Sequence, residues 1–531
     1  MTIDAGARSC VMIAMIVTFG VMLPSLAAPT LLGSDDWAMI WVFHNEGPAY
    51  LQKYMTQAAH PGLAPILNLL FWLGGENPAH LAHAVAILFH LANGWLLWLI
   101  FRQGRDNEAF AASLAVLYLS SPFVAGFDFI FSAVQYDVLI FCYLLSIWLS
   151  GSTNPLLFSC AIVSALFGLS FETLIALEPI RWWFLYQQRR NIMGIAWRAT
   201  PFALIILLII GLRVIWIHTA GVYFEYNVVR NVDVRTYLDA FVKHLYFFLQ
   251  AIDSAEYLSG LVQYDSVWWL GFLGAGAIAI GVTAAHLRFQ PSYRSLAVLV
   301  ILGSAVLVAG TLPYDLVGSI PQRSDNSARF ALVSQIGALI LVGSFVQLLP
   351  LVKLRAIALG LAVLVFASVP PQMAKWLLYE ELVLRDFRSQ VGQYLAGAGE
   401  QRLVVQFQPA SKQFLYRNRG CLTSYDINVA LELASQRHGS FVFDQGCPPS
   451  YYSAPDACRF TGYRSERCPS RRQSAEFRLN PDMERFDRLQ LADLVRRVLF
   501  GLPLAAGRLI IERDAVTAVP DPSHARSTGT W

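Results

Sequence analysis

Residues 81–101 read LAHAVAILFHLANGWLLWLIF, an apolar run without Lys, Arg, Asp or Glu. A helix of about 20 such residues crosses the hydrocarbon core of a bilayer, so the run predicts a transmembrane helix. Similar runs recur as far as residue 369 and predict about eleven spans. The predicted spans are Cys10–Ala28, Leu81–Phe101, Phe110–Phe123, Val134–Leu149, Pro155–Phe171, Thr173–Tyr186, Pro201–Ile217, Val267–His286, Leu296–Leu312, Phe330–Leu349 and Leu354–Val369.

The composition indicates the same class of protein. Hydrophobic residues make up 56% of the 531 residues and charged residues only 14%, whereas soluble proteins carry roughly 25% charged residues. The net charge of +3 is too small to indicate nucleic-acid binding, and no basic block with interleaved aromatic residues is present. The predicted fold class is therefore an all-α polytopic membrane protein, with residues 1–370 forming the transmembrane domain.

Lys and Arg are enriched in the cytoplasmic loops of membrane proteins. With a cytoplasmic N-terminus, the predicted inner loops hold Arg102, Arg105, Arg189, Arg190, Arg198, Arg288, Arg294, Lys353 and Arg355. The opposite loops are richer in acidic and aromatic residues. An odd number of spans then puts the chain after Val369 on the extracytoplasmic side. We expect a bacterial inner (plasma) membrane protein.

Residues 371–531 change in character and predict a small extracytoplasmic α+β domain. Short strands are predicted at Leu403–Phe407 and Phe441–Phe443, and a helix within Met483–Phe500. The tail from Pro520 is predicted to be disordered. The domain carries Cys421, Cys447, Cys458 and Cys468. An even number of cysteines in an exported segment favours disulfides, for which three pairings are open, and a zinc site is the alternative.

Two adjacent acids, Asp35 and Asp36, follow the first predicted span on its outer side. Trp37, Ile40 and Trp41 follow at helical spacing and predict a short amphipathic helix lying in the membrane interface. Either acid can serve as a catalytic base for a reaction at the membrane surface. The alternative is that they cap this helix and are solvated.

Two further polar positions on the predicted outer side are candidates for substrate contact. His60 precedes Pro61 and a short apolar helix predicted at Ile66–Leu73. Glu172 follows the fifth predicted span and should emerge at a depth similar to that of Asp35. The long segment 220–265 contains a predicted helix over Thr236–Ile252 and should lie on the outer surface.

Arg323 and Arg329 lie in an outer loop just before the tenth predicted span. A guanidinium binds phosphate in a two-pronged geometry, so these residues suit the phosphate of a lipid. The alternative is that they form salt bridges to Asp315 and Asp325.

These features together resemble the GT-C superfamily of membrane glycosyltransferases, and in particular its protein O-mannosyltransferase-like and lipid-A aminoarabinose transferase-like branches. The resemblance is spread over about residues 10–370. It rests on Ser34-Asp35-Asp36-Trp37, His60-Pro61 with the span bearing His90 and Asn93, Phe171-Glu172-Thr173 and Arg329-Phe330. Many relatives have Arg-Pro where this chain has His60-Pro61. A protonated His can supply part of the charge that such an Arg provides.

The resemblance implies transfer of a sugar from a polyprenyl-phosphate donor to an acceptor hydroxyl on the outer side of the membrane, with inversion at the anomeric carbon. It assigns Asp35 or Asp36 as the base, and the other acid orients the acceptor or raises the proton affinity of its neighbour. His60, Glu172, Arg323 and Arg329 would bind substrate. No cofactor is predicted to be required, although two acids are compatible with a divalent cation. The expected partners are the lipid-linked donor, a glycan, lipid or protein acceptor, and membrane lipids.

The competing hypothesis is a transporter or lipid flippase. Such proteins carry internal repeats and paired charges near the middle of the bilayer. The sequence shows no repeat, and its polar residues gather at the predicted outer side instead. This pattern favours the transferase.

Overall fold

The computed structural model describes most of the first 398 residues and separate parts of the remainder. The described residues are 5–27, 39–40, 43–44, 46–57, 62–75, 78–103, 107–121, 130–189, 191–219, 233–252, 255–263, 267–287, 292–318, 331–398, 402–407, 442–443, 457–461, 464–467, 472–479, 489–504 and 507–511.

Six described helices are long and apolar enough to cross a membrane. They are α1 (Ala5–Met22) with η1 (Leu23–Ala27), α5 (Pro78–Phe101), α10 (Ile192–Thr219), α13 (Val267–Ala285), α14 (Tyr293–Val317), and α16 (Val352–Phe366) continued by α17 (Val369–Ala398). Shorter apolar helices are α4 (Ala64–Gly74), α6 (Glu108–Leu119), α7 (Ile130–Ser150), α8 (Pro155–Gly168) and α15 (Ser334–Leu348). These helices support an integral membrane protein, as the composition predicted.

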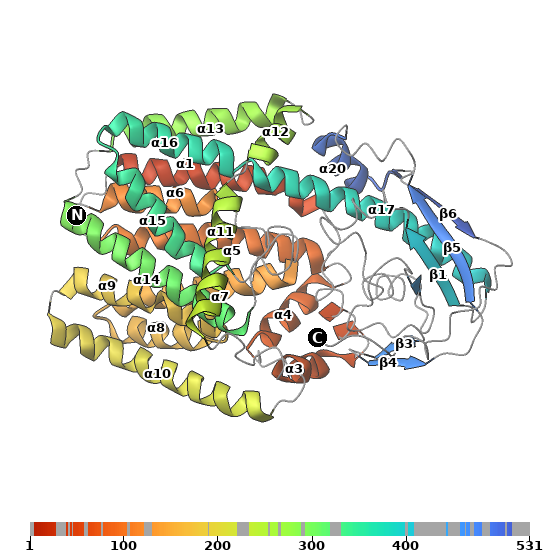
Figure 1. Cartoon of the computed structure of the whole chain (residues 1–531), viewed down its shortest axis with the longest axis horizontal. Helices are drawn as coiled ribbons and strands as arrows, with labels where there is room; N and C mark the ends of the chain where they lie inside the picture. Colours follow the sequence, from red (N-terminus) through yellow and green to blue (C-terminus); the bar gives the residue numbers. More distant parts are fainter. Residues whose placement is uncertain are drawn as a thin grey trace. The chain divides into compact units, whose positions relative to one another are not determined.

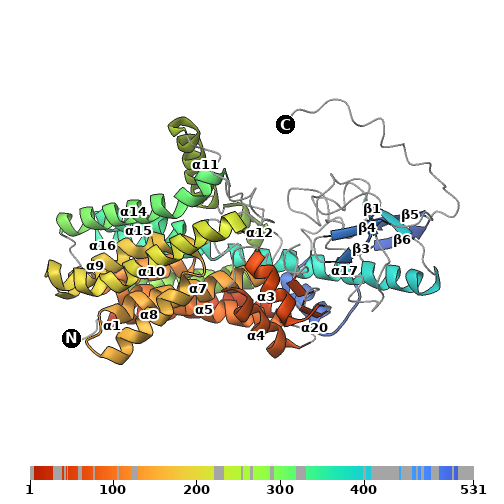
Figure 2. The same cartoon turned by 90° about the horizontal axis from the view of Figure 1, so that it is seen from below.

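The apolar helices pack side by side in a bundle (Figures 1 and 2). Helix α5 packs against α6 and α7, and α7 packs against α8. On the other side of the bundle, α1 contacts α6 and α13, and α13 contacts α16. Helix α14 pairs with α15, which also contacts α6. The core of the bundle is therefore built from contacts between helices that are distant in the sequence as well as between neighbours.

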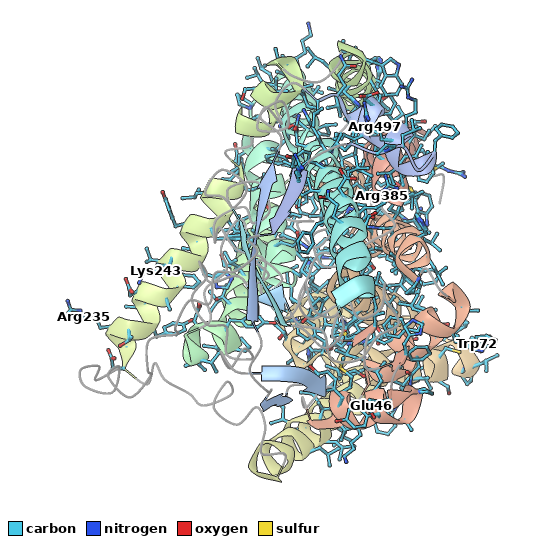
Figure 3. The ribbon with its side chains drawn as sticks, turned by 90° about the vertical axis from the view of Figure 1, so that its right-hand side faces the viewer. Glu46, Trp72, Arg235, Lys243, Arg385 and Arg497 are labelled. Atoms are coloured by element: carbon cyan, nitrogen blue, oxygen red, sulfur yellow. The ribbon has the colours of Figure 1, made fainter. Side chains whose placement is uncertain are left out.

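Helix α10 exposes a large apolar surface. Met193, Trp197, Leu204, Leu207 and Leu208 are all more than half exposed. Such a surface is costly in water and favourable against lipid chains. The exposed face of α10 is therefore suited to the hydrocarbon of a bilayer. Figure 3 shows another exposed aromatic side chain, that of Trp72 on α4.

Helices α14 and α15 approach so closely that their backbones touch. A Cβ added at Gly337 would overlap the backbone nitrogen of Leu307 and lie 2.7 Å from the Gly303 carbonyl oxygen. One at Gly310 would lie 2.9 Å from the Ser334 Cα. Small residues are common where membrane helices cross closely, because packing rather than the hydrophobic effect drives their association. These glycines fix the position of α15 on α14.

Several sequence predictions are confirmed locally. Helix α4 covers the helix predicted at Ile66–Leu73 and ends at Gly74, and Gly75 has a φ of 56°, a positive value that glycine adopts without steric cost. Helix α11 (Val234–Ile252) covers the helix predicted in the long outer segment, and strands lie at both predicted strand positions.

The segment predicted as the sixth span differs from a continuous apolar helix. It divides into the 3₁₀ helix η3 (Glu172–Leu177) and the amphipathic α9 (Glu178–Arg189), which is not among the apolar helices of the described chain. Within the predicted span Thr173–Tyr186, the dipeptide Glu178-Pro179 favours a kink with a buried acid. Pro179 instead stands in the first turn of α9, where proline is tolerated because the first amide groups have no helical acceptor.

The described chain clusters into two compact units, residues 1–381 with 485–502, and residues 382–484 with 503–531. The first also contains α3 (Pro48–Gln57), α12 (Ala255–Gln263) and α20 (Leu491–Leu499). The second contains β1 (Arg402–Phe407), β2 (Val442–Phe443), β3 (Ala457–Thr461), β4 (Arg464–Arg467), β5 (Arg472–Leu479) and β6 (Gly507–Ile511). Four strands form one sheet in the order β2-β1-β5-β6. In this sheet β1 runs parallel to both β2 and β5, and β6 runs antiparallel to β5. Strands β3 and β4 form a separate antiparallel pair.

Because α14 and α15 are in close backbone contact, a methyl group added at Gly337 should lower the stability of the protein. Gly337→Ala should destabilise the protein by about 1–3 kcal/mol, because the added carbon has no room against the α14 backbone. Thermal unfolding of the purified protein in detergent measures this. Gly271→Ala on α13 is the matched control, since its Cβ would meet no atom within 4 Å among the described residues. Equal unfolding temperatures for the two variants would contradict the close packing.

Candidate functional site

Polar side chains from three elements meet at the C-terminal end of α14. Thr173 on η3 is buried, and its Oγ1 lies 3.2 Å from the Tyr314 hydroxyl oxygen. Glu172, the preceding residue, is partly buried. The next residue on α14, Asp315, contacts His244 of α11. We call Thr173, Tyr314, Asp315 and His244 the α14-end cluster.

His244 and Asp315 form the most deeply buried pair of this cluster. The Nδ1 atom of His244 lies 3.1 Å from Oδ1 of Asp315, and both side chains are 0% exposed. The other ring nitrogen of His244, Nε2, is buried and has no hydrogen-bond partner among the described residues. Burial and the Asp315 carboxylate raise the pKa of the nearby Tyr237 phenol. The cluster therefore holds a buried His–Asp pair in which one ring nitrogen has no hydrogen-bond partner among the described residues.

The amphipathic pattern of α11 explains why His244 is buried. Ala240, His244, Phe247 and Phe248 share one buried face, and the His244 ring stacks on Phe248 with 6.0 Å between ring centroids. Lys243 lies on the exposed face and forms an ion pair with Asp239. Figure 3 shows Arg235 and Lys243 extending away from the neighbouring helices. The helix thus buries His244 against α14 and keeps the charges of Asp239 and Lys243 on its exposed face.

The end of α14 is shaped by a glycine. The chain leaves the helix at Gly318, which has a φ of 75° and donates from its backbone nitrogen to the carbonyl oxygens of Asp315 and Tyr314. This left-handed cap ends the helix within one turn of Asp315. The loop that carries Arg323 and Arg329 follows it in the sequence. Both arginines lie outside the described residues.

The other end of this loop is held against α14. Ala331, Leu332 and Val333 are buried, and Ser334 at the start of α15 contacts Gly310 of α14. Ala331 is two residues from Arg329, and Gly310 is five residues from Asp315. The described chain therefore anchors both flanks of the arginine loop near the α14-end cluster.

The segment around His60 is anchored near Glu172 in a similar way. Gly62 lies so close to the Ser170 side chain that it has no room for a Cβ. Ser170 is two residues before Glu172, and Gly62 is two residues after His60. Close approach of this kind requires glycine. The contact between Gly62 and Ser170 therefore brings together residues that lie two positions from His60 and from Glu172 in the sequence.

Five predicted site residues, Asp35, Asp36, His60, Arg323 and Arg329, lie outside the described residues, so their roles stay predictions. Glu172 is described, is partly buried, and directly precedes Thr173 of the α14-end cluster. The segment after the two acids is anchored on α4, since the rings of Phe43 and Phe71 lie 4.9 Å apart.

The sequence pattern does not indicate the His244–Asp315 pair. Asp315 was predicted only as an alternative salt-bridge partner of Arg323 and Arg329. A lone His on the apolar face of the predicted Thr236–Ile252 helix was the available signal. Such a residue is usually a satisfied core group, and its partner stands 71 residues away. Only the packing of α11 on α14 reveals the contact.

The polar residues inside α5 connect it to neighbouring helices, as polar side chains of membrane helices often do. Asn93 Nδ2 donates to the Asp137 carbonyl oxygen on α7 at 3.1 Å. His90 Nε2 lies 3.4 Å from the Leu119 carbonyl oxygen on α6, and its ring stacks on Tyr118. These contacts tie α5 to both neighbours.

A second buried charge pair supports η3, which carries Glu172 and Thr173. Arg181 Nε donates to Glu178 Oε1 at 2.8 Å, and its Nη1 donates to Ser146 Oγ at 3.0 Å. The Tyr143 hydroxyl also donates to Glu178 Oε1, at 2.5 Å. The Arg181 guanidinium stacks over Phe202, 3.8 Å from the ring centroid. This network joins the start of α9 to α7 and α10, and so fixes the end of η3.

The described residues contain no group of three or more His, Cys, Asp or Glu side chains that could hold a metal ion. Cys10, Cys142 and Cys160 are free thiols. Cys421, Cys447 and Cys468 lie outside the described residues, and only the backbone of Cys458, in β3, is described. The disulfide and zinc alternatives therefore remain open.

A scan against family models and a search of curated proteins found no match for the chain.

The Glu178–Arg181 network predicts a strong effect of removing one partner. Glu178→Gln should lower the unfolding free energy by about 3–5 kcal/mol, because it leaves the Arg181 charge buried without a carboxylate. Thermal or denaturant unfolding in detergent measures the loss, with Asp239→Asn on the exposed face of α11 as a control that leaves stability unchanged. Combining Glu178→Gln with Arg181→Met should recover part of the stability. A double variant that is less stable than Glu178→Gln would contradict this account.

Proposed function

We propose that the protein is an integral membrane glycosyltransferase of the GT-C type. It transfers a sugar from a polyprenyl-phosphate donor to an acceptor hydroxyl at the extracytoplasmic side of the membrane. The acceptor oxygen attacks the anomeric carbon as the bond from this carbon to the phosphate oxygen breaks. Polyprenyl phosphate leaves, and the configuration of the sugar inverts.

The α14-end cluster is the observation that carries this proposal. Glu172 was predicted as a substrate contact from the sequence, and it lies beside Thr173, whose hydroxyl oxygen is 3.2 Å from that of Tyr314. The flanks of His60 and Arg329 are anchored nearby through Gly62 and Ala331. A polar site at the end of a helix bundle, next to apolar helices, suits a substrate with a polar head and a lipid tail.

The roles of the residues follow from the reaction. Asp35 or Asp36 takes the proton of the acceptor hydroxyl, and the other acid orients the acceptor. Glu172 hydrogen-bonds the sugar or acceptor. Arg323 and Arg329, with His60, stabilise the charge that develops on the departing phosphate. The reaction balances without a metal ion or other cofactor, because the Asp carries the proton away.

We also propose the finer topology predicted from the sequence. About eleven spans place the N-terminus in the cytoplasm and residues 371–531 outside, in a bacterial inner membrane. The six long and five shorter apolar helices support such a count, with α4 in place of the segment 173–186. The strands β1–β6 support a small α+β domain.

A transporter or flippase is the second candidate. It is favoured by polar side chains buried within the bundle. Both ring nitrogens of His83 and Oε1 of Gln135 are buried without a hydrogen-bond partner among the described residues, and the Asp137 side chain is buried too. Polar groups at membrane depth often mark a substrate or ion path. A transporter would move the lipid-linked sugar across proteoliposomes and release no polyprenyl phosphate.

Release of polyprenyl phosphate tests the transferase directly. The purified protein, incubated with a panel of polyprenyl-phosphate sugars and candidate acceptors, should release polyprenyl phosphate from at least one donor. Asp35→Asn or Asp36→Asn should reduce this rate by about 10²–10⁴-fold, the usual contribution of a general base. Asp239→Asn, on the exposed face of α11, is the control for removing an acid elsewhere on the surface.

Three results are informative. A folded variant with a rate near zero at one acid identifies the base. Wild-type rates in both Asn variants would show that the two acids cap a helix, and would reject the site assignment. Transport without release from any donor would reject the transferase and favour the second candidate.

A further inference from the structure

Helix α11 has a second apolar face, which points away from the bundle. The residues of this face follow one another by three or four positions and are half or more exposed, namely Val234, Leu238, Val242, Tyr246 and Leu249. We call these five residues the α11 apolar stripe. We propose that the stripe is embedded among the acyl chains at one surface of the bilayer, so that α11 is a lipid-binding helix of the membrane interface. This role goes beyond the proposed function and is compatible with a transferase or a transporter.

Helix α11 is suited to lie along a membrane rather than to cross it. It is not among the six described helices that are long and apolar enough to span a bilayer. Its 19 residues include Arg235, Asp239 and Lys243, and charges are costly in the hydrocarbon. Figures 1 and 2 show that α11 runs across the apolar helices of the bundle, whereas those helices run along one another. A helix that crosses a bundle of spans in this way lies along the membrane surface.

Three faces of α11 meet three different surroundings. Ala240, His244 and Phe247 are buried against the bundle. The side chains of Asp239 and Lys243 are 60% and 56% exposed and form a charged face. At about 3.6 residues per turn, the apolar stripe occupies a third sector, separate from both of these faces. A helix at the edge of a bundle and at the membrane surface meets protein, water and lipid, and α11 has one face for each of them.

The position of α11 on α14 gives the depth of the stripe. One face of α14 exposes apolar side chains at Val298, Ile301, Val308 and Leu312, and Leu312 is the last exposed residue inside this helix. Asp315, which contacts His244 of α11, follows three residues later, or about 4.5 Å along the helix axis. Helix α11 therefore crosses α14 where the exposed apolar face of α14 ends. This is the level at which the hydrocarbon of a bilayer gives way to the headgroups.

The edge of the stripe has side chains typical of this level. Tyr246 stands four residues after Val242 and three after Lys243, so it lies where the stripe meets the charged face. Tyrosine is enriched at membrane interfaces, because its ring is apolar and its hydroxyl is polar. The long side chain of Lys243 can keep its ammonium group among the headgroups while its stem lies against apolar surface. Since His244 ties α11 to Asp315, an embedded stripe would hold the α14-end cluster at headgroup depth.

Fluorescence quenching in lipid nanodiscs tests the inference on the full-length protein. A fluorescent amino acid replaces Val242 in one variant and Lys243 in another, so that the two labels are neighbours on different faces of α11. One quencher is a phosphatidylcholine with a nitroxide on an acyl chain close to the glycerol, and the other is iodide in the water. The lipid nitroxide should quench the label at Val242 at least about threefold more than the label at Lys243, because interfacial helices bury their apolar face about 5–10 Å deep. Iodide should give the opposite order.

Two further labels serve as references. A label at Leu207, on the exposed face of α10, gives the signal of an apolar helix in contact with lipid. Leu238 and Asp239 form a second neighbouring pair on the same two faces of α11, and they carry the test if a variant of the first pair fails to fold. Both pairs are exposed, so labelling should leave the unfolding temperature close to that of wild type.

The two quenchers separate the possible surroundings of the stripe. Quenching by the lipid nitroxide at Val242, at a level comparable with Leu207, supports the inference. Strong quenching by iodide at Val242, equal to that at Lys243, would show that the stripe faces water and would overturn it. Weak quenching by both agents at Val242 would show that protein covers the stripe, either another segment of this chain or a second copy, and would also overturn it. None of these results depends on glycosyl transfer, so the inference and the proposed function can fail separately.

Discussion

The backbone contact between α14 and α15 is the constraint on which the candidate site depends. Gly337 faces the Leu307 nitrogen and the Gly303 carbonyl oxygen with no space for a side chain. Two helices held at this distance cannot slide or rotate without a clash, because protein interiors are close-packed. Asp315 at the end of α14 and Ala331 before α15 are therefore held in a fixed relation. The sequence segment that carries Arg323 and Arg329 connects these two positions.

Two buried polar pairs set the surroundings of this frame. Glu178 and Arg181 hold the end of η3 against α7 and α10, and His244 and Asp315 hold α11 against α14. Buried polar groups need hydrogen-bond partners, so each pair fixes the element that carries it. The two pairs differ in one respect. Oε1 of Glu178 accepts from both Arg181 and Tyr143, whereas Nε2 of His244 is buried without a hydrogen-bond partner among the described residues.

The sequence predicts the coarse fold well because membrane helices have a strong and simple signal. Apolar runs identified α4, α5, α13 and α14. The break at Glu178 was not predicted, because a short apolar segment before Pro179 is compatible with either a kinked span or a 3₁₀ turn followed by a new helix. The break depends on Arg181, whose partners Tyr143 and Ser146 come from α7.

The site was only partly predictable for a related reason. Glu172 stood out because it is an acid at the end of an apolar run. His244 did not, since nothing local indicates that its partner is Asp315 on a helix that begins about 50 residues later. Contacts of this kind depend on tertiary packing, which single-sequence patterns do not encode.

Photo-crosslinking tests the central claim most directly, namely that the α14-end cluster binds a lipid-linked phosphate. The probe is a polyprenyl phosphate with a diazirine beside the phosphate, and labelled peptides are mapped by mass spectrometry. We predict labelling within residues 170–177, 240–249 or 308–318 that excess unlabelled polyprenyl phosphate suppresses. Labelling confined to the exposed face of α10, or unaffected by competitor, would contradict the account.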